Sequence, residues 1–84
     1  MLPLTFVKTG DIVKIMKVSG KDDTKRHLND LGFVEGAVLT VISSHNGDVI
    51  LNVKDSRLAL TREVADKVMI NLADKSDLIK SLQK

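Results

Sequence analysis

Apolar residues fall in short runs along the whole chain, and polar turns separate these runs at close spacing. Such a pattern is typical of the short strands of a small all-β fold. It predicts five strands, at residues 12–18, 37–43, 49–53, 58–60 and 68–70. Apolar residues occupy both faces of the first strand, which indicates a closed or strongly bent sheet, or a bulge that switches faces.

The stretch from Arg26 to Gly36 predicts a corner between a short helix and the second strand. Leu28 and Leu31 lie three residues apart and therefore share one helical face. Gly32 follows at once, and glycine can end a helix in the left-handed conformation without side-chain cost. Gly36 supplies a second turn. We interpret Leu28, Leu31, Gly32 and Gly36 as a structural motif that locks the helix against a small sheet.

Polar residues can fix the ends of the predicted elements. Asn46-Gly47 lies between two apolar runs and is a strong hairpin signal, because both residues tolerate a positive φ. A short side-chain oxygen can also accept the free amide protons of a helix's first turn. We expect such capping from Asp22 or Asp23 for the helix at 23–31, from Thr61 for a helical turn at 62–66, and from Ser76 for a tail helix that begins at Asp77.

Together these elements predict a mainly β domain, a small SH3-like β-barrel of about five strands. One short helix is inserted after the first strand, and another short helix ends the chain. The 84 residues leave room for one domain, which we place at 1–72, with a C-terminal tail at 73–84. A six-stranded or open α+β sheet is the main alternative.

Composition and charge narrow the classes of function. The net charge is +2, from 13 basic and 11 acidic side chains that are interspersed, so we expect no strong basic field. Two phenylalanines are the only aromatic residues, which disfavours base stacking and aromatic-lined peptide grooves. Without cysteine, neither disulfides nor thiolate metal sites can form. We also expect no signal peptide and no membrane span, because every apolar run is too short.

Residues that could carry chemistry are sparse and far apart. Serine, histidine and aspartate never occur at the spacing of a catalytic triad, so we expect no catalytic residues. His27 and His45 belong to no local metal-binding motif, and two solvated histidines are the simpler interpretation. A transition-metal site stays open as the alternative, formed in three dimensions by these histidines with Asp22, Asp23, Asp48 or Asp55.

The predicted helix carries a basic cluster of Lys21, Lys25 and Arg26. Neighbouring acids dilute this cluster as a nucleic-acid footprint, so we expect no nucleic-acid partner. Two interpretations remain. The cluster is either a solvated helix face or a surface at which Lys25 and Arg26 contact an acidic patch on a partner protein.

The order of these pieces resembles the FeoA family, small cytoplasmic proteins of the bacterial ferrous-iron transport system, from about Leu4 to Ile70. Glu35 departs from the family pattern, in which proline is common before the glycine. The resemblance rests on residues 10–15, on Arg26-His27-Leu28 with Leu31-Gly32-Phe33, on Gly36 with the strand after it, and on 58–65 with 68–70.

The resemblance implies a non-enzymatic cytoplasmic accessory without a cofactor. It would bind the membrane transporter FeoB near its cytoplasmic GTP-binding domain, and would meet the membrane only through that transporter. Arg26 and Arg57 are candidate arginine fingers if GTP hydrolysis is affected. The partner-binding surface would comprise Lys25, Arg26, Asn29, Phe33 and Arg57.

Two further questions stay open at this stage. Small barrels with exposed strand edges can pair, so a homodimer remains an alternative to a single copy. The same barrel also occurs as the C-terminal domain of some iron-responsive repressors. Because this sequence shows no DNA-binding domain, we expect the free-standing accessory.

Overall fold

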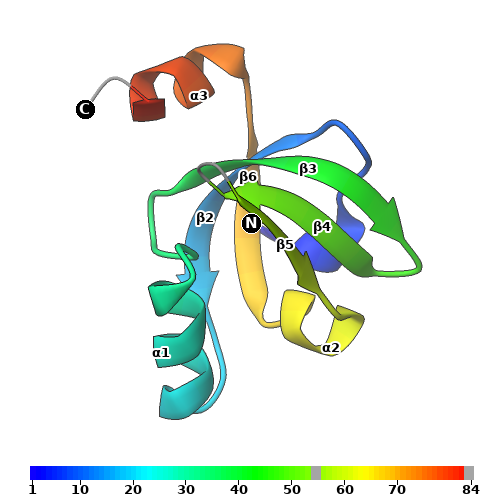
Figure 1. Cartoon of the computed structure of the whole chain (residues 1–84), viewed down its shortest axis with the longest axis vertical. Helices are drawn as coiled ribbons and strands as arrows, with labels where there is room; N and C mark the ends of the chain where they lie inside the picture. The colour runs from blue at the N-terminus through cyan, green and yellow to red at the C-terminus, as the bar shows by residue number, and fades with distance from the viewer. Residues whose placement is uncertain (54–55, 83–84) are drawn as a thin grey trace.

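The computed structural model describes residues 1–53 and 56–82, which form one antiparallel sheet with short helices around it (Figure 1). The order of strands in the sheet is β1-β6-β2-β3-β4-β5. The elements are β1 (Leu2–Pro3), the 3-10 turn η1 (Leu4–Phe6), β2 (Ile12–Val18), α1 (Asp22–Asp30), β3 (Val38–His45), β4 (Asp48–Val53), β5 (Ser56–Leu60), α2 (Arg62–Ala65), β6 (Val68–Ala73) and α3 (Lys75–Leu82).

The predicted mainly β, SH3-like class is confirmed, including the helix after the first long strand and the helix at the C-terminus. The sheet has six strands because Leu2 and Pro3 pair with β6 at its edge. Proline lacks a backbone donor and is tolerated at such an edge. The sheet remains open between β1 and β5, and η1 packs near this opening, where it contacts β4, β6 and α2.

Three strands extend by at least two residues beyond the apolar runs that predicted them. β3 continues to His45, β5 begins at Ser56, and β6 continues to Ala73. Backbone groups make the ladder, so polar residues can join it wherever one face of the sheet is solvated. A bulge, one of the alternatives predicted for this strand, is present in β2, where the pairing with β6 shifts register between Ile15 and Lys17.

The predicted hairpin between β3 and β4 is confirmed. Asn46 has a φ of 52° and Gly47 a φ of 89°, and His45 pairs directly with Asp48 across the turn. A β-carbon on Gly47 would lie only 2.6 Å from two side-chain carbons of Arg62, so the stem of Arg62 crosses the turn at close range. The hairpin is therefore packed against the start of α2.

The core fills the space between the curved sheet, α1 and η1. It contains no polar or charged residue among those the structure describes. Phe33 is its largest fully buried side chain. The other members are Leu4, Val7, Val13, Ile15, Leu28, Leu39, Val41, Val49, Leu51, Val53, Leu60, Ala65, Val68 and Ile70.

The corner after α1 has the geometry that its sequence predicts. The N–H of Phe33 donates to the carbonyl of Leu28 at 2.9 Å, and the N–H of Gly32 donates to the carbonyl of Asn29 at 3.0 Å. With Gly32 at a φ of +104°, this is a Schellman motif, which satisfies the last carbonyls of the helix. Leu28 is buried and Leu31 packs against the core, so the predicted structural motif holds α1 in place.

The two capping predictions for α1 and α3 need correction. Lys21 occupies the N-cap of α1, and neither Asp22 nor Asp23 caps it; both lie in the first turn, where acids suit the helix dipole.

α3 begins at Lys75, ahead of the predicted Asp77, and Ser76 does not cap it. Instead the N–H of Asp77 donates to Asp74 Oδ1 at 3.1 Å, and the N–H of Asp74 donates to Asp77 Oδ2 at 3.2 Å. The hydrogen bond from Asp77 lowers the pKa of Asp74.

Candidate interaction surface

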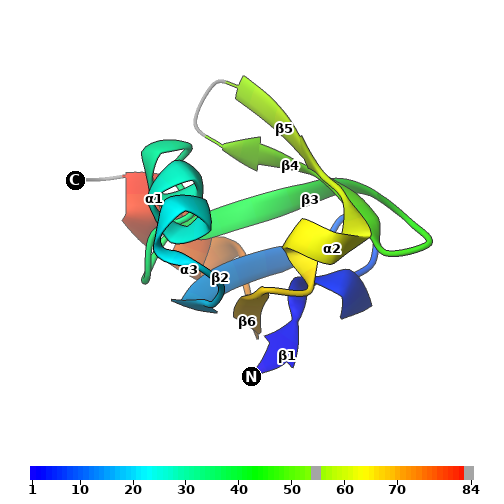
Figure 2. The same cartoon turned by 90° about the horizontal axis from the view of Figure 1, so that it is seen from below.

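α1 presents most of its surface to solvent. Within α1, all of which the structure describes, Leu28 is the single buried residue. Lys25, Arg26 and Asn29 are exposed. Two perpendicular views place the helix beside β2 at the outside of the molecule (Figures 1 and 2). A helix that is fixed at its C-terminal end and free along its polar face is suited to contact another protein.

An open depression of about 320 Å³ lies between α1 and the end of β2. Lys25 and Asn29, one helical turn apart, form its α1 side. Val34, which follows the corner, is 44% exposed although it is apolar. The full lining is Lys17, Val18, Lys25, Asn29, Val34 and Glu35. We call this surface the α1 depression.

The charges along α1 are not evenly compensated. Arg26 has three aspartates at a spacing of three or four residues: Asp22, Asp23 and Asp30. At that spacing side chains are neighbours on the helix surface, so the charge of Arg26 is locally balanced. Lys25 has one such acid, Asp22, which it shares with Arg26. α1 as a whole carries more acids than basic residues, but its acids lie mainly around Arg26, so Lys25, beside the α1 depression, is the less compensated of its two basic residues.

The predicted partner-binding residues do not form one group. Lys25 and Asn29 meet in the α1 depression, and Arg26 is exposed beside them on the same helix. Arg57 lies on β5, opposite Asn52, and takes no part in the α1 depression. Phe33 was assigned wrongly: it is 0% exposed, because the Schellman motif turns it into the core. It cannot contact a partner.

Sequence reasoning missed Lys17 and Val34. Lys17 belongs to β2, and only the tertiary fold brings it next to α1. Val34 could have been identified from the sequence as an exposed apolar residue. It directly follows Phe33, and the corner buries only one of these two side chains.

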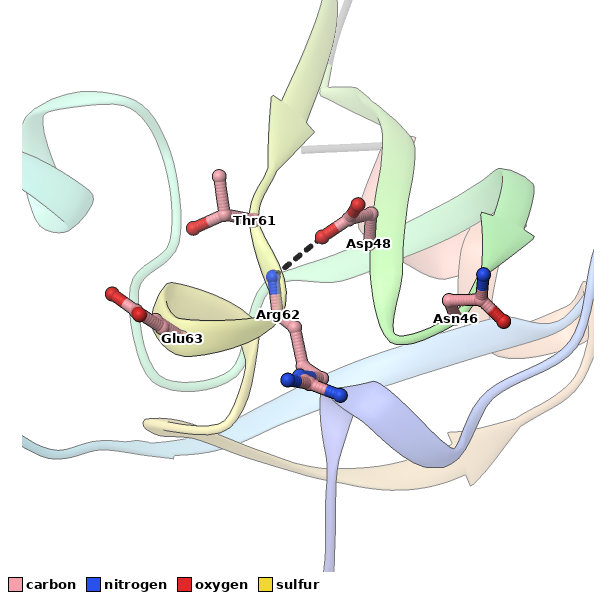
Figure 3. Close-up of a pocket in the computed structure, with 5 residues that line it drawn as sticks. All are labelled: Asn46, Asp48, Thr61, Arg62 and Glu63. Atoms are coloured by element: carbon pink, nitrogen blue, oxygen red, sulfur yellow. Dashed lines mark hydrogen bonds between the residues drawn. The ribbon is translucent and has the colours of Figure 1, made fainter.

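A second open depression, of about 500 Å³, lies between the β3–β4 hairpin and α2 (Figure 3). Its side chains do not converge, because Glu63, Arg62 and Asn46 point in different directions. The carboxylate of Asp48 instead accepts a hydrogen bond from the N–H of Arg62 at 2.8 Å. Asp48 therefore caps α2 from another strand. Thr61 has the backbone conformation of an N-cap, but its side chain makes no capping hydrogen bond, contrary to prediction.

This cap leads to a stability prediction. Asp48→Ala leaves the amide of Arg62 without its acceptor, so we expect the free energy of unfolding to fall by about 1 kcal/mol. Asp48→Asn should cost less, because an amide oxygen can still accept the bond. Urea unfolding of both variants measures the difference. Equal stability of Asp48→Ala and the unchanged chain would contradict the capping role.

The histidines lie in separate elements, His27 in α1 and His45 at the end of β3. His45 Nε2 lies 3.2 Å from the side-chain amide of its neighbour Asn46. Across residues 1–53 and 56–82, no group of three or more histidines and acids could hold a metal ion. Asp55, one of the predicted ligands, lies outside the described residues. The structure therefore offers no observation that favours the metal-binding alternative.

Comparison with known proteins decides the family. Residues 2–72 match the FeoA domain. The chain belongs to the FeoA family. A relative from Methanocaldococcus jannaschii, named as an Fe(2+) transport protein A, is 35% identical over 74 residues, which are 88% of this chain and 90% of the relative.

Solved structures of FeoA proteins share the fold. A crystal structure described as the iron uptake regulatory protein FeoA is 27% identical, with a TM-score of 0.79 over 86% of this chain and 97% of that one. FeoA from Chlorobium tepidum is 24% identical, with a TM-score of 0.73 over 87% of this chain and 71% of that one. The crystal structure of ScaR with bound Zn²⁺ shares the fold alone, at 16% identity and a TM-score of 0.74; this chain covers 36% of it.

Among residues 1–53 and 56–82, none of the helices has the length and apolar character needed to cross a bilayer.

Proposed function

We propose that this FeoA-family chain is a non-enzymatic, cytoplasmic accessory of ferrous iron uptake. It binds the cytoplasmic part of a FeoB-type membrane transporter near the GTP-binding domain. The family match and the name of the Methanocaldococcus jannaschii relative support the link to ferrous iron. The observation that carries the binding role is the exposed face of α1, with Lys25, Arg26 and Asn29 free for contact.

The contacts that hold α1 in place support this role energetically. A docking element that is already ordered loses less conformational freedom when a partner binds. α1 is ordered by the burial of Leu28 and by the Schellman motif at Gly32, neither of which uses its outer face. The helix can therefore contact a partner without any rearrangement of the core.

Co-purification from native membranes tests the binding role, because it presumes nothing about the contact surface. We expect an affinity-tagged chain, expressed in its own host, to retain the FeoB-type transporter after mild solubilisation. Deletion of the chain should lower the uptake of radioactive ferrous iron. Absence of the transporter from the purified fraction, together with unchanged uptake, would overturn the proposal.

A role in GTP hydrolysis is a narrower form of the same proposal. Arg26 and Arg57 are exposed, as an arginine finger must be before docking. If either residue acts in this way, its replacement by alanine lowers the GTPase rate of the complex while binding persists. A rate that does not respond to the chain at all would leave binding as the whole function.

A further inference from the structure

We propose that the α1 depression binds a short acidic segment of the transporter that carries one apolar side chain. The apolar side chain would pack on Val34, and carboxylates beside it would meet Lys17 and Lys25. This inference rests on the proposed function and names the chemistry of the partner segment. It uses a surface that includes two residues, Lys17 and Val34, outside the predicted partner surface.

Val34 supplies most of the exposed apolar surface of the α1 depression. Nearly half of its surface is exposed, whereas the adjacent Phe33 is fully buried. Val18, at the end of β2, adds a half-buried apolar surface to the same lining. Removal of such surface from water favours association. The depression is small and open, which suits one apolar side chain rather than a long hydrophobic helix.

Lys17 and Lys25 supply the positive charge of the α1 depression. Both are exposed and line the depression from different elements, β2 and α1. Glu35 supplies a single carboxylate to the described lining, so two positive charges face one negative charge. Complementary charge across an interface favours an acidic partner and disfavours a basic one.

Two further groups orient the segment. The side-chain amide of Asn29 can both donate to and accept from a peptide backbone. Glu35 repels carboxylates, so the acidic residues of the segment should lie toward Lys17 and Lys25 and away from Glu35. The occupant is thus a peptide segment with a defined direction, and not a free anion.

Calorimetric titration tests this arrangement. The full chain is titrated with the purified cytoplasmic part of the transporter at low and at high salt. We expect the double variant Lys17→Glu/Lys25→Glu to bind at least about tenfold more weakly, and to lose most of the salt dependence. Lys17→Gln/Lys25→Gln should weaken binding by a smaller factor. The matched control Lys75→Glu/Lys80→Glu changes the net charge equally on α3 and should bind as the unchanged chain does.

The outcomes separate the two proposals. If the unchanged chain does not bind, the proposed function and this inference both fail. If it binds and the Lys17/Lys25 variants bind equally well, only the inference fails. Circular dichroism shows whether each variant is folded, and the glutamine variant preserves the test if the glutamate variant unfolds. Overlapping peptides from the transporter's cytoplasmic part give a direct check: binding confined to basic or wholly apolar peptides would overturn the inference.

Discussion

Replacement of Phe33 by alanine is expected to lower the free energy of unfolding by about 3–5 kcal/mol. Phe33 is 0% exposed and is the largest side chain of the core. Its removal leaves a cavity between α1 and the sheet, since both are held by other contacts. The loss is comparable to the whole stability of a small domain, so a large unfolded fraction is expected at room temperature.

Phe6 provides the matched control, because it is the other phenylalanine of the chain and is 70% exposed. Phe6→Ala should change stability by no more than about 0.5 kcal/mol, as is usual for surface positions. Urea unfolding of the two variants, followed by circular dichroism, measures the contrast. A small effect of Phe33→Ala would contradict the assignment of Phe33 to the core and would reopen its predicted role in partner binding.

Gly32→Ala has the second-largest expected effect, a loss of about 2–5 kcal/mol. Two causes add together. The left-handed φ of +104° is unfavourable for a residue with a β-carbon, and that β-carbon would lie 2.7 Å from Val53 Cγ1. Val53 is buried in the core, so its side chain has little room to move away. The variant should therefore loosen the packing of α1 against the sheet.

Gly36→Ala separates these two causes. Gly36 also has a left-handed φ, +91°, but nothing lies within 4 Å of its added β-carbon. We expect Gly36→Ala to cost about 1–2 kcal/mol from backbone strain alone. The difference between the two variants then measures the clash with Val53, and thermal unfolding gives both values. If both alanine variants lose equal stability, contact with Val53 does not restrict residue 32.

Patterns confined to neighbouring residues were predicted well. Leu28, Leu31 and Gly32 lie within one turn of each other, so their spacing was sufficient to locate the end of α1. Asn46-Gly47 located its hairpin for the same reason. The apolar residue after Gly32 is at the position of a Schellman motif that commonly packs back onto the helix. That rule, applied to Phe33, would have assigned it to the core.

Features that depend on residues far apart in sequence were missed. Asp48 caps α2 from a position 14 residues earlier, which no local capping rule could identify. β1 contains only two residues, too few to show any periodicity. Lys17 and Lys25 share one depression because α1 folds back beside β2. The sequence was thus sufficient to place Lys25 and Arg26 on one helix, whereas the residues that line the depression opposite Lys25 depended on the fold.

In the proposed function, α1 and the surface beside it form the docking site. Titration of the ¹⁵N-labelled chain with the unlabelled cytoplasmic part of the transporter tests it most directly, because every backbone amide is observed at once. We expect shift changes concentrated at residues 17–18, 21–30 and 34–35, with α3 unchanged. Shift changes confined to β5 or α3, with α1 unaffected, would contradict it.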